Sequence, residues 1–358
     1  MLNFDKYSNR KSIFLIKKKK FKVIEKKFNF NKEEFFFRVI ECGVCSSDLK
    51  FFHTGSRIKK YPIVLGHEIC AEKIKYSKEK NKVITTGDFF VFGAEAGCGK
   101  CEYCKFKSKT NLCDQPISIG SNYDGGFSNI FSVKKKIFKN LPKIKLNNYI
   151  KYSSLSESVA CVINGLEVIN FKKNDNLLVL GAGYMGILFV NVAKIFGAKK
   201  ILVVDYNLKR LKIAKKIGAD YFVKIKKRDN EYKVKNEILK KYKKIKFNKI
   251  VSSNSNYKSH ELAIKLAPKL GEVNLYGGIS DNKKKNIIFD SNFVHYNQIK
   301  ITGSFSSSLN HLKKACSLIK NKKIKFNLIG IKHASYENIK NCFEKLSEMK
   351  IIKCIFRP

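Results

Sequence analysis

The sequence contains no long apolar run and few prolines. Apolar runs such as residues 187–190 are far shorter than the ~20 residues that a membrane-spanning helix requires. Only five prolines occur among 358 residues, and no low-complexity linker stands out. The first 20 residues carry lysines on the wrong side of a brief apolar stretch and lack a small-residue cleavage site. We therefore expect no signal peptide and a cytoplasmic location.

Acidic residues are also scarce, and this leaves a large excess of positive charge. The chain has 29 acidic residues against 73 lysines and arginines, a formal net charge of +44. Such a charge invites a nucleic-acid-binding function, but the lysines are spread over the whole chain and no RNA-binding aromatic signature accompanies them. We expect only weak, salt-dependent attraction to polyanions. A polyanion-binding protein without catalysis remains the alternative from a different class.

The chain is long enough for two domains, since 358 residues exceed one ordinary core and 44% of them are hydrophobic. Cysteine is abundant, with 11 residues, but the number is odd and the expected location is reducing. A disulfide scaffold is therefore not expected. Four of the cysteines follow one another closely, at Cys98, Cys101, Cys104 and Cys113. Four soft sulfurs without an open position suit a structural zinc, and a redox CxxC pair is the alternative.

A second group of metal-ligand residues precedes this lobe. Cys45 lies in CGVCSSDLK, and His67 and Glu68 lie in VLGHEICAE. One thiolate and one imidazole leave room for a carboxylate and a water molecule. This composition indicates a catalytic zinc with an open position for a substrate oxygen.

Residues 177–207 have the pattern of a nucleotide-binding βαβ unit. A short apolar strand is followed by three glycines that open a helix, at Gly181, Gly183 and Gly186. These glycines allow the backbone to approach a pyrophosphate at the helix N-terminus. A second strand ends at Asp205, whose charge favours NAD over NADP, and nearby Arg210 weakens that preference slightly. Further strand signals predict a doubly wound sheet over about residues 155–290.

Together, the three elements resemble the zinc-dependent medium-chain dehydrogenases of the alcohol dehydrogenase superfamily, over nearly the whole chain. The closest branch is the L-iditol (sorbitol) 2-dehydrogenase-like one. The stretches that carry the resemblance are CGVCSSDLK, YPIVLGHEICAE, CGKCEYC, YDGGFSNIF, SESVACVING, LLVLGAGYMG and FVHYNQIKITGSF.

The resemblance implies an α/β chain with two domains. Residues 1–150 would form a GroES-like β-barrel catalytic domain that carries the zinc lobe at 98–113. Residues 151–290 would form the NAD-binding Rossmann domain, and residues 291–358 would return to the catalytic domain. The family also implies a homodimer or homotetramer.

The resemblance further implies a ligand set for the catalytic zinc. Cys45 and His67 match ligands, and Glu68 matches an acid that ligates or exchanges with water. Glu157 matches the carboxylate of the family's Glu-Pro motif, the third or water-bridged ligand. Cys161, one helical turn later, is its rival.

The implied reaction is oxidation of an alcohol by NAD. Zinc lowers the pKa of the substrate hydroxyl, Ser47 passes the proton outward, and the carbon delivers hydride to nicotinamide. Lys50 stands where many relatives have a histidine that completes the proton relay. His53 is nearby and is expected to be a solvated loop residue.

Three further positions depart from the family pattern. Ser158 replaces the usual proline after Glu157, and the Cys104–Cys113 interval is one residue longer than is common. Animal sorbitol dehydrogenases have an Arg-Tyr pair where this chain has Ser306-Ser307, which argues against sorbitol as substrate. We expect an NAD-dependent polyol or sugar-alcohol dehydrogenase. An L-threonine 3-dehydrogenase-like or sugar-phosphate alcohol dehydrogenase is the alternative.

Overall fold

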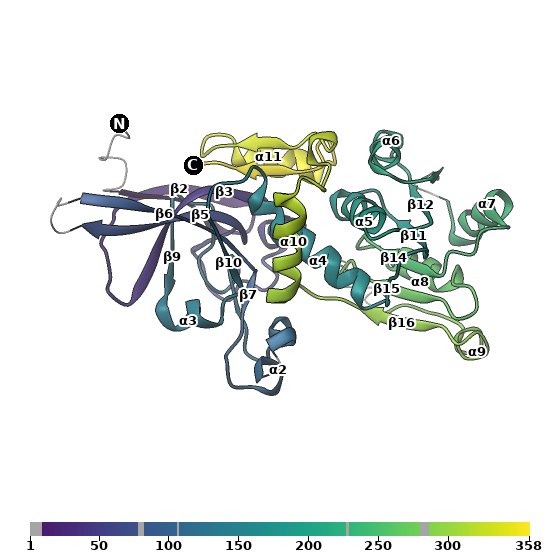
Figure 1. Cartoon of the computed structure of the whole chain (residues 1–358). Helices are drawn as coiled ribbons and strands as arrows, with labels where there is room; N and C mark the ends of the chain where they lie inside the picture. Colours follow the sequence, from purple (N-terminus) through teal and green to yellow (C-terminus); the bar gives the residue numbers. More distant parts are fainter. Residues whose placement is uncertain (1–8, 78–81, 106, 227–228, 280–285) are drawn as a thin grey trace. The chain divides into compact units, whose positions relative to one another are not determined.

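The computed structural model describes residues 9–77, 82–105, 107–226, 229–279 and 286–358. The chain divides into two compact units, each with its own hydrophobic core (Figure 1). The first unit comprises Met1–Ala160, Ser306–Lys322 and Gly330–Pro358. The second unit comprises Cys161–Phe305 and Lys323–Ile329.

These boundaries differ from the predicted ones at 150 and 291. The second unit starts at Cys161, within the helix α4 (Ser156–Glu167). It ends after Phe305, because α9 (Ser291–Tyr296) and β16 (Lys300–Gly303) precede the return and β16 completes the sheet of this unit.

The first unit is built mainly of antiparallel strands. Its largest sheet has the order β10-β6-β5-β3-β18-β17, with β9 also paired to β3. These strands are β3 (Glu34–Val44), β5 (Glu68–Ser77), β6 (Lys82–Phe92), β9 (Ile130–Lys134), β10 (Lys143–Leu146), β17 (Lys332–Ala334) and β18 (Cys354–Phe356). A second sheet, in the order β2-β1-β4, comprises β1 (Asn9–Lys17), β2 (Lys20–Lys27) and β4 (Ile63–Val64). A two-stranded ribbon comprises β7 (Glu95–Ala96) and β8 (Ile117–Ser118).

Short helices connect these strands, and aromatic side chains fill the core between them. The helical segments are α1 (Ser46–Thr54), α2 (Glu102–Lys105), η2 (Lys107–Leu112), α3 (Lys135–Asn140), η3 (Ser153–Leu155), α10 (Leu309–Lys320) and α11 (Ile339–Ser347). The fully buried phenylalanines of the core are Phe37, Phe92, Phe127, Phe131, Phe343 and Phe356. Many of their rings meet edge to face, the arrangement that aromatic quadrupoles favour.

Strand β3 is the element that positions the first unit's chemistry. It pairs with β5 on one side and with β18 on the other, so its last residues are buried on both edges. In the antiparallel register Gly43 faces Glu68, and Val44 faces Cys354. The end of β3, the start of β5 and the start of β18 therefore meet at one place.

The second unit is a six-stranded parallel sheet in the order β13-β12-β11-β14-β15-β16. Its remaining strands are β11 (Asn176–Leu180), β12 (Lys200–Asp205), β13 (Tyr221–Lys224), β14 (Lys249–Ser252) and β15 (Glu272–Leu275). The intervening helical segments are α5 (Tyr184–Ile195), α6 (Leu208–Ile217), α7 (Glu231–Tyr242), α8 (Tyr257–Lys265) and η4 (Phe326–Leu328). The strand order reverses at β11, as in the predicted doubly wound fold, and ligands of such sheets bind at this switch point.

One disulfide is present among the described residues, although no disulfide scaffold was expected. Cys342 on α11 and Cys354 on β18 are both buried and joined. The other nine cysteines are free. The sequence could not predict this pair, because the two cysteines become neighbours only when α11 packs on β18.

Candidate active site

Three predicted ligands of the catalytic zinc come together in the first unit. Cys45 directly follows β3, His67 directly precedes β5, and Glu68 is the first residue of β5. The ligand atoms of Cys45, His67 and Glu68 all lie within 4.8 Å of one another. The pairing of Gly43 with Glu68 explains this meeting, because it places the two strand ends side by side.

Two glycines make room for the group of Cys45, His67 and Glu68. A Cβ on Gly43 would lie 1.9 Å from Oε2 of Glu68, so only glycine leaves space for that carboxylate. Gly66 has φ +93°, a conformation that L side chains rarely adopt, and its missing Cβ would collide with Phe127. The ligand residues thus depend on backbone positions that carry no side chain.

Asp48 orients both Cys45 and His67, and sequence reasoning missed this role. Its Oδ2 accepts a hydrogen bond from the backbone N–H of Cys45 at 2.8 Å, which caps α1. Its Oδ1 accepts from the N–H of Gly66 at 3.2 Å and lies 3.6 Å from Nδ1 of His67. A carboxylate at Nδ1 holds the ring and favours the tautomer whose other nitrogen can bind a metal.

The charges around His67 and its burial have opposite effects on the pKa of its imidazole. Burial alone lowers the pKa of this imidazole, but the charges and hydrogen bonds of Asp48 and Cys45 outweigh it. The pKa of His67 is therefore raised well above its ordinary value. A divalent cation bound by His67 would take the place of a proton on this ring.

Glu68 is held by a buried lysine that the sequence did not indicate. Nζ of Lys353 donates to Oε1 and Oε2 of Glu68, both at 2.6 Å, and to the carbonyl oxygen of Val44 at 3.0 Å. Lys353 is 1% exposed and Glu68 is fully buried. All three ammonium protons thus have acceptors. Glu68 can approach a metal only by sharing its oxygens with this lysine.

Glu157 and Ser47 lie on helices of the same unit. Glu157 is buried near the start of α4, and its carboxylate is not part of the three-residue group. Its role as a ligand, and that of Cys161 as its rival, therefore remain predictions. Ser47 is the second residue of α1 and is half-buried, two residues from Cys45.

The expectation that His53 is a solvated loop residue is wrong, because His53 lies on α1. Its Nε2 lies 2.8 Å from Oγ of Ser347 on α11, and its ring meets that of Phe52 edge to face. Burial, followed by the charge of Lys19, lowers its pKa. These contacts give His53 a packing role between two helices.

The four cysteines of the lobe also converge. The sulfurs of Cys98, Cys101, Cys104 and Cys113 lie within 4.8 Å of one another. Sγ of Cys98 is 3.9 Å from Sγ of Cys104, and Sγ of Cys101 is 3.8 Å from Sγ of Cys113. The turn before α2 and the 3-10 helix η2 bring these residues together. Four sulfurs at these separations match the closed tetrahedral set of a structural zinc.

Backbone N–H groups and burial give the thiols of the lobe different pKa values. The N–H groups of Lys100 and Cys101 donate to Sγ of Cys98 at 3.5 and 3.3 Å and lower its pKa to about 6. Burial raises the pKa of Cys104 to about 12. Cys113 accepts from the N–H groups of Cys98 and Gln115, although burial raises its pKa. Hydrogen bonds to sulfur stabilise the thiolate that a metal needs.

In the second unit, the glycines lie where the parallel sheet requires them. Gly181 follows β11 with φ +105°, and a Cβ on Gly186 would lie 1.9 Å from the carbonyl oxygen of Gly181. Gly183 caps α5, and a Cβ there would meet no heavy atom within 4 Å. The space before the α5 N-terminus is therefore open to a pyrophosphate.

Asp205 ends β12 beside this loop and is buried. Its Oδ2 accepts from the N–H of Ala182 at 2.6 Å, and its Oδ1 accepts from the N–H of Asn207 at 2.7 Å. Each carboxylate oxygen keeps further acceptor capacity, which a ribose hydroxyl could use. The backbone N–H of Arg210 donates to the Asn207 side chain, which caps α6.

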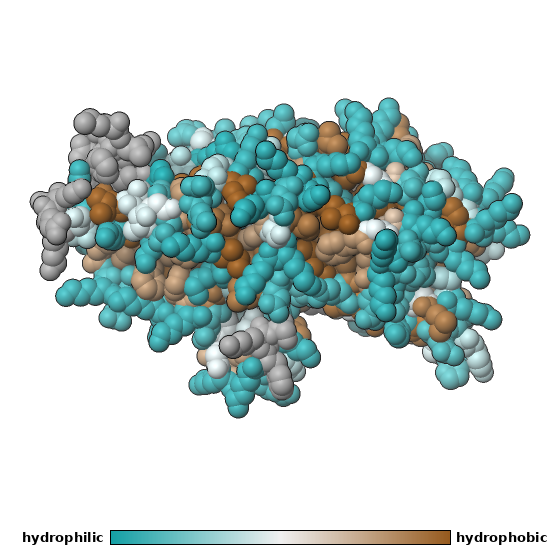
Figure 2. All heavy atoms as spheres, viewed as in Figure 1, coloured by the Kyte–Doolittle hydropathy of each residue, from teal (hydrophilic) through white to brown (hydrophobic). Residues whose placement is uncertain are grey.

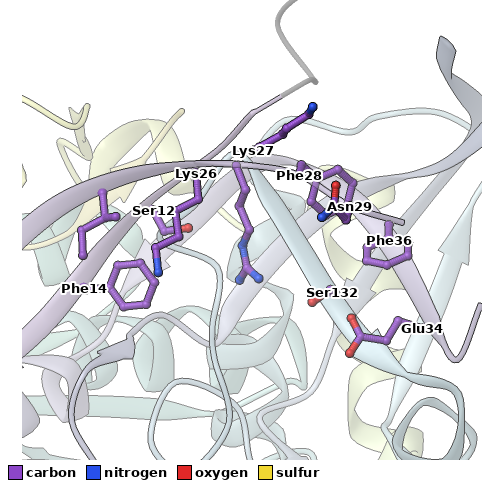
Figure 3. A pocket seen from close by; sticks show the side chains of 11 residues that line it. Ser12, Phe14, Lys26, Lys27, Phe28, Asn29, Glu34, Phe36 and Ser132 are labelled. Atoms are coloured by element: carbon purple, nitrogen blue, oxygen red, sulfur yellow. The ribbon is translucent and has the colours of Figure 1, made fainter. Parts of the chain in front are cut away.

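A separate pocket of about 230 Å³ lies among β1, β2, β3 and β9 (Figure 3). Its walls include the rings of Phe14, Phe28 and Phe36 and the carboxylate of Glu34. None of the predicted site residues lines it, so it is distinct from both metal-ligand groups.

Comparison with known proteins finds two family models along the chain. Residues 31–143 match the family model described as alcohol dehydrogenase GroES-like domain, and residues 185–321 match that described as zinc-binding dehydrogenase. D-arabitol-phosphate dehydrogenase of Enterococcus avium is 26% identical over 326 residues, 88% of this chain and 87% of that protein. Sorbitol dehydrogenase of Bacillus subtilis strain 168 is 29% identical over 208 residues, 56% of this chain and 57% of that protein.

A solved structure has the same fold. The short chain alcohol dehydrogenase of E. coli CFT073, complexed with the cofactor NADH, superposes with a TM-score of 0.82 at 22% identity. The match covers 98% of this chain and 100% of that one. The predicted fold class, a GroES-like β-barrel domain with a Rossmann domain, is thereby confirmed. The chain belongs to the zinc-dependent medium-chain dehydrogenases, an oxidoreductase family.

Among the described residues, no helix combines the length and the apolar character that crossing a bilayer requires.

Proposed function

We propose that the chain is a zinc- and NAD-dependent dehydrogenase that oxidises a secondary hydroxyl group of a polyol or sugar alcohol. The observation that carries this proposal is the convergence of Cys45, His67 and Glu68 at the meeting ends of β3 and β5, with Asp48 behind the histidine. A thiolate, an imidazole and a carboxylate form the donor set of a zinc site that keeps an open position.

The residues of the site have separate roles in this reaction. Bound zinc would act as a Lewis acid that lowers the pKa of the substrate hydroxyl. Cys45 and His67 would hold the ion, and Glu68 or Glu157 would supply the carboxylate. Ser47, on the first turn of α1, would accept the hydroxyl proton and pass it outward.

The dinucleotide would bind at the N-terminus of α5. Gly181 and Gly183 leave room for its pyrophosphate, and the carboxylate of Asp205 would accept hydrogen bonds from the adenosine ribose. A 2′-phosphate would meet the negative charge of Asp205, which favours NAD. A bound nicotinamide would supply the hydride acceptor, and the protein's contribution would be to hold the two reacting carbons within reach.

Two of the curated relatives narrow the substrate class. The curated relatives act, by their names, on sorbitol and on D-arabitol phosphate. A polyol is therefore the first candidate, and a sugar-phosphate alcohol is the second. An L-threonine 3-dehydrogenase-like activity is the amino-alcohol alternative.

The lobe of four cysteines would carry a second, structural zinc. Its sulfurs bind metal only while they are reduced, so we expect the chain to work in a reducing compartment such as the cytoplasm. The family also suggests a homo-oligomer.

The test is a substrate screen combined with metal analysis. Purified protein is expected to contain two zinc ions per chain and to reduce NAD with at least one member of a panel of polyols, polyol phosphates and amino alcohols, followed by NADH absorbance. Cys45→Ala is expected to abolish turnover and to leave the lobe zinc in place. If no panel alcohol reduces NAD or NADP, the proposed function is wrong.

A further inference from the structure

A further buried carboxyl group lies beside the catalytic-type cluster and has no role in the mechanism above. Glu95 is the first residue of β7 and is 7% exposed. Its Oε2 accepts a hydrogen bond from the hydroxyl of Ser306, which is far away in sequence but in the same unit. A buried carboxylate is costly unless donors surround it, so this one calls for an explanation.

The ribbon that carries Glu95 packs against the loop that carries His67. Glu95 pairs with Ser118 across β7 and β8. Two residues later, a Cβ on Gly120 would lie only 2.9 Å from the backbone nitrogen of Gly66, which directly precedes His67. Glu95 is therefore one ribbon away from the metal-ligand cluster, and the charge of His67 acts on its carboxyl group.

Burial, one hydrogen bond and two charges act on the Glu95 carboxyl group. Burial raises its pKa, whereas the Ser306 hydrogen bond, the charge of His67 and that of Arg57 lower it. Arg57 is exposed, so water and salt screen its guanidinium, whereas Glu95 is shielded from solvent. Solvent therefore weakens the charge of Arg57 more than it weakens the charge of Glu95.

The segment opposite Glu95 is shaped to present hydroxyl groups. Ser306 has φ +51°, a left-handed conformation that non-glycine residues seldom adopt, and in this conformation its hydroxyl reaches Glu95. Oγ of the next residue, Ser307, is buried and has no hydrogen-bond partner among the residues that the structure describes. Unused hydrogen-bonding capacity thus lies directly beside the Glu95–Ser306 pair.

We propose that Glu95, oriented by Ser306, is the substrate-recognition group of the site and selects an uncharged polyhydroxy alcohol over its phosphate ester. The proposal rests on the proposed function above. A carboxylate only accepts hydrogen bonds, so it pairs with the adjacent hydroxyl groups that a polyol supplies. The same charge repels a phosphate or carboxylate on the substrate, at a place where water screens little.

The experiment compares four- to six-carbon polyols with their phosphate esters. Wild-type protein is expected to prefer the free polyol by at least tenfold in kcat/KM. Glu95→Gln keeps the side-chain volume and removes the charge, so it is expected to raise KM for the polyol about tenfold or more with a smaller change in kcat. It should also raise the ester-to-polyol ratio of kcat/KM at least tenfold. Ser306→Ala should shift both quantities in the same direction by less.

Glu337→Gln is the matched control, since Glu337 also accepts a serine hydroxyl, that of Ser335, but is exposed and outside the site. It should leave both substrates unaffected. Isothermal calorimetry of polyol binding in the absence of NAD gives a readout that does not need turnover, and zinc content and circular dichroism verify that each variant folds.

The outcomes separate the two proposals. If polyols are oxidised and Glu95→Gln leaves the ester-to-polyol ratio unchanged, the role of Glu95 is wrong and the proposed function stands. A wild-type preference for a phosphate ester or an amino alcohol overturns the substrate class. If no alcohol is oxidised, the proposed function fails, and calorimetry then tests the role of Glu95 alone. Loss of polyol binding in Glu95→Gln supports that role. Polyol binding that is unchanged in the variant, or undetectable in the wild type, overturns it.

Discussion

At the scale of single residues, Asp48 joins local structure to the site. Its carboxylate caps α1 through the N–H of Cys45 and lies against Nδ1 of His67. One side chain therefore fixes a helix start and the orientation of two metal ligands. Partners of this kind behind a ligating histidine commonly change metal affinity 10- to 100-fold.

We predict that Asp48→Asn lowers the affinity of the catalytic zinc about 10- to 100-fold, because the amide removes the charge that holds the imidazole. Competition with a chromogenic chelator measures this affinity, and the lobe zinc should be unaffected. The control is Asp290→Asn, since Asp290 caps α9 through Phe293 and belongs to no metal-ligand group. Equal zinc affinity in wild type and Asp48→Asn would contradict the orienting role.

Lys353 presents a second prediction for a single residue. Removing its ammonium group leaves the buried Glu68 carboxylate without a counter-charge, and such a loss costs about 3–5 kcal/mol. We predict that Lys353→Met lowers the urea midpoint of the first unit in zinc-free protein. The double variant Glu68→Gln/Lys353→Met should recover part of the loss, because it removes the unpaired charge as well. A single variant as stable as wild type would show that Glu68 finds its counter-charge elsewhere.

At the scale of elements, the lobe between β7 and β8 is a loop whose sulfurs are arranged by short helices and backbone N–H groups. These N–H groups lower the pKa of Cys98 to about 6, whereas burial raises that of Cys104 to about 12. Because the thiolate is the reactive form, the two cysteines should behave differently at neutral pH once zinc is removed.

We predict that iodoacetamide labels Cys98 of zinc-depleted protein with a rate that rises with pH through a midpoint near 6. Below this pH the thiol is protonated and labelling should cease. Cys104 should stay unlabelled at pH 7, and added zinc should protect both. Peptide mass spectrometry measures each site, with buried Cys316, whose pKa burial raises to about 11, as internal control. A midpoint for Cys98 near 8.5, the ordinary thiol value, would be evidence against this arrangement.

The N-terminus of α5 supports a prediction about the cofactor. A side chain at Gly183 would point into open space, so Gly183→Val should leave the melting temperature nearly unchanged. It should nevertheless weaken NADH binding at least ~10-fold, because the added methyl groups occupy the path of the pyrophosphate. Fluorescence titration with NADH measures the change, and Lys194→Gln, near the other end of the same helix, is the control. Unaltered NADH affinity would place the cofactor elsewhere.

At the scale of the whole molecule, the feature that the mechanism does not use is the charge of +44. Hydrophilic side chains cover most of the face visible in Figure 2, and the lysines come from both units. A positive charge so widely spread attracts polyanions without selecting a sequence or a site.

We predict that the protein binds duplex DNA weakly at 50 mM salt and at least ~100-fold more weakly at 200 mM, because counterion release drives the binding. Zinc removal and Cys45→Ala should leave this binding unchanged, since neither alters the surface lysines. Fluorescence anisotropy at several salt concentrations provides the measurement. Binding that is sequence-selective and persists at 200 mM salt would favour a nucleic-acid function.

Much of the fold could be predicted from the sequence. The βαβ pattern at 177–207 determined a parallel nucleotide-binding unit, because glycine spacing and apolar periodicity are local properties. The predicted domain boundaries differ from the limits of the two compact units. The sequence placed the return near 291, whereas the chain returns at Ser306, because β16 joins the sheet by pairing with β15, which only the assembled sheet reveals.

The candidate site was also predicted only in part from the sequence. Sequence determined the residue types and spacing that indicate metal chemistry, namely the four clustered cysteines and the cysteine, histidine and glutamate further upstream, because ligand chemistry is a property of side chains. Only the tertiary structure brought Asp48 to His67, Lys353 to Glu68 and Ser306 to Glu95. The last two pairs are 285 and 211 residues apart, and no local rule links such distant positions. Strand register and burial decide these contacts, and they are settled only when the whole chain packs.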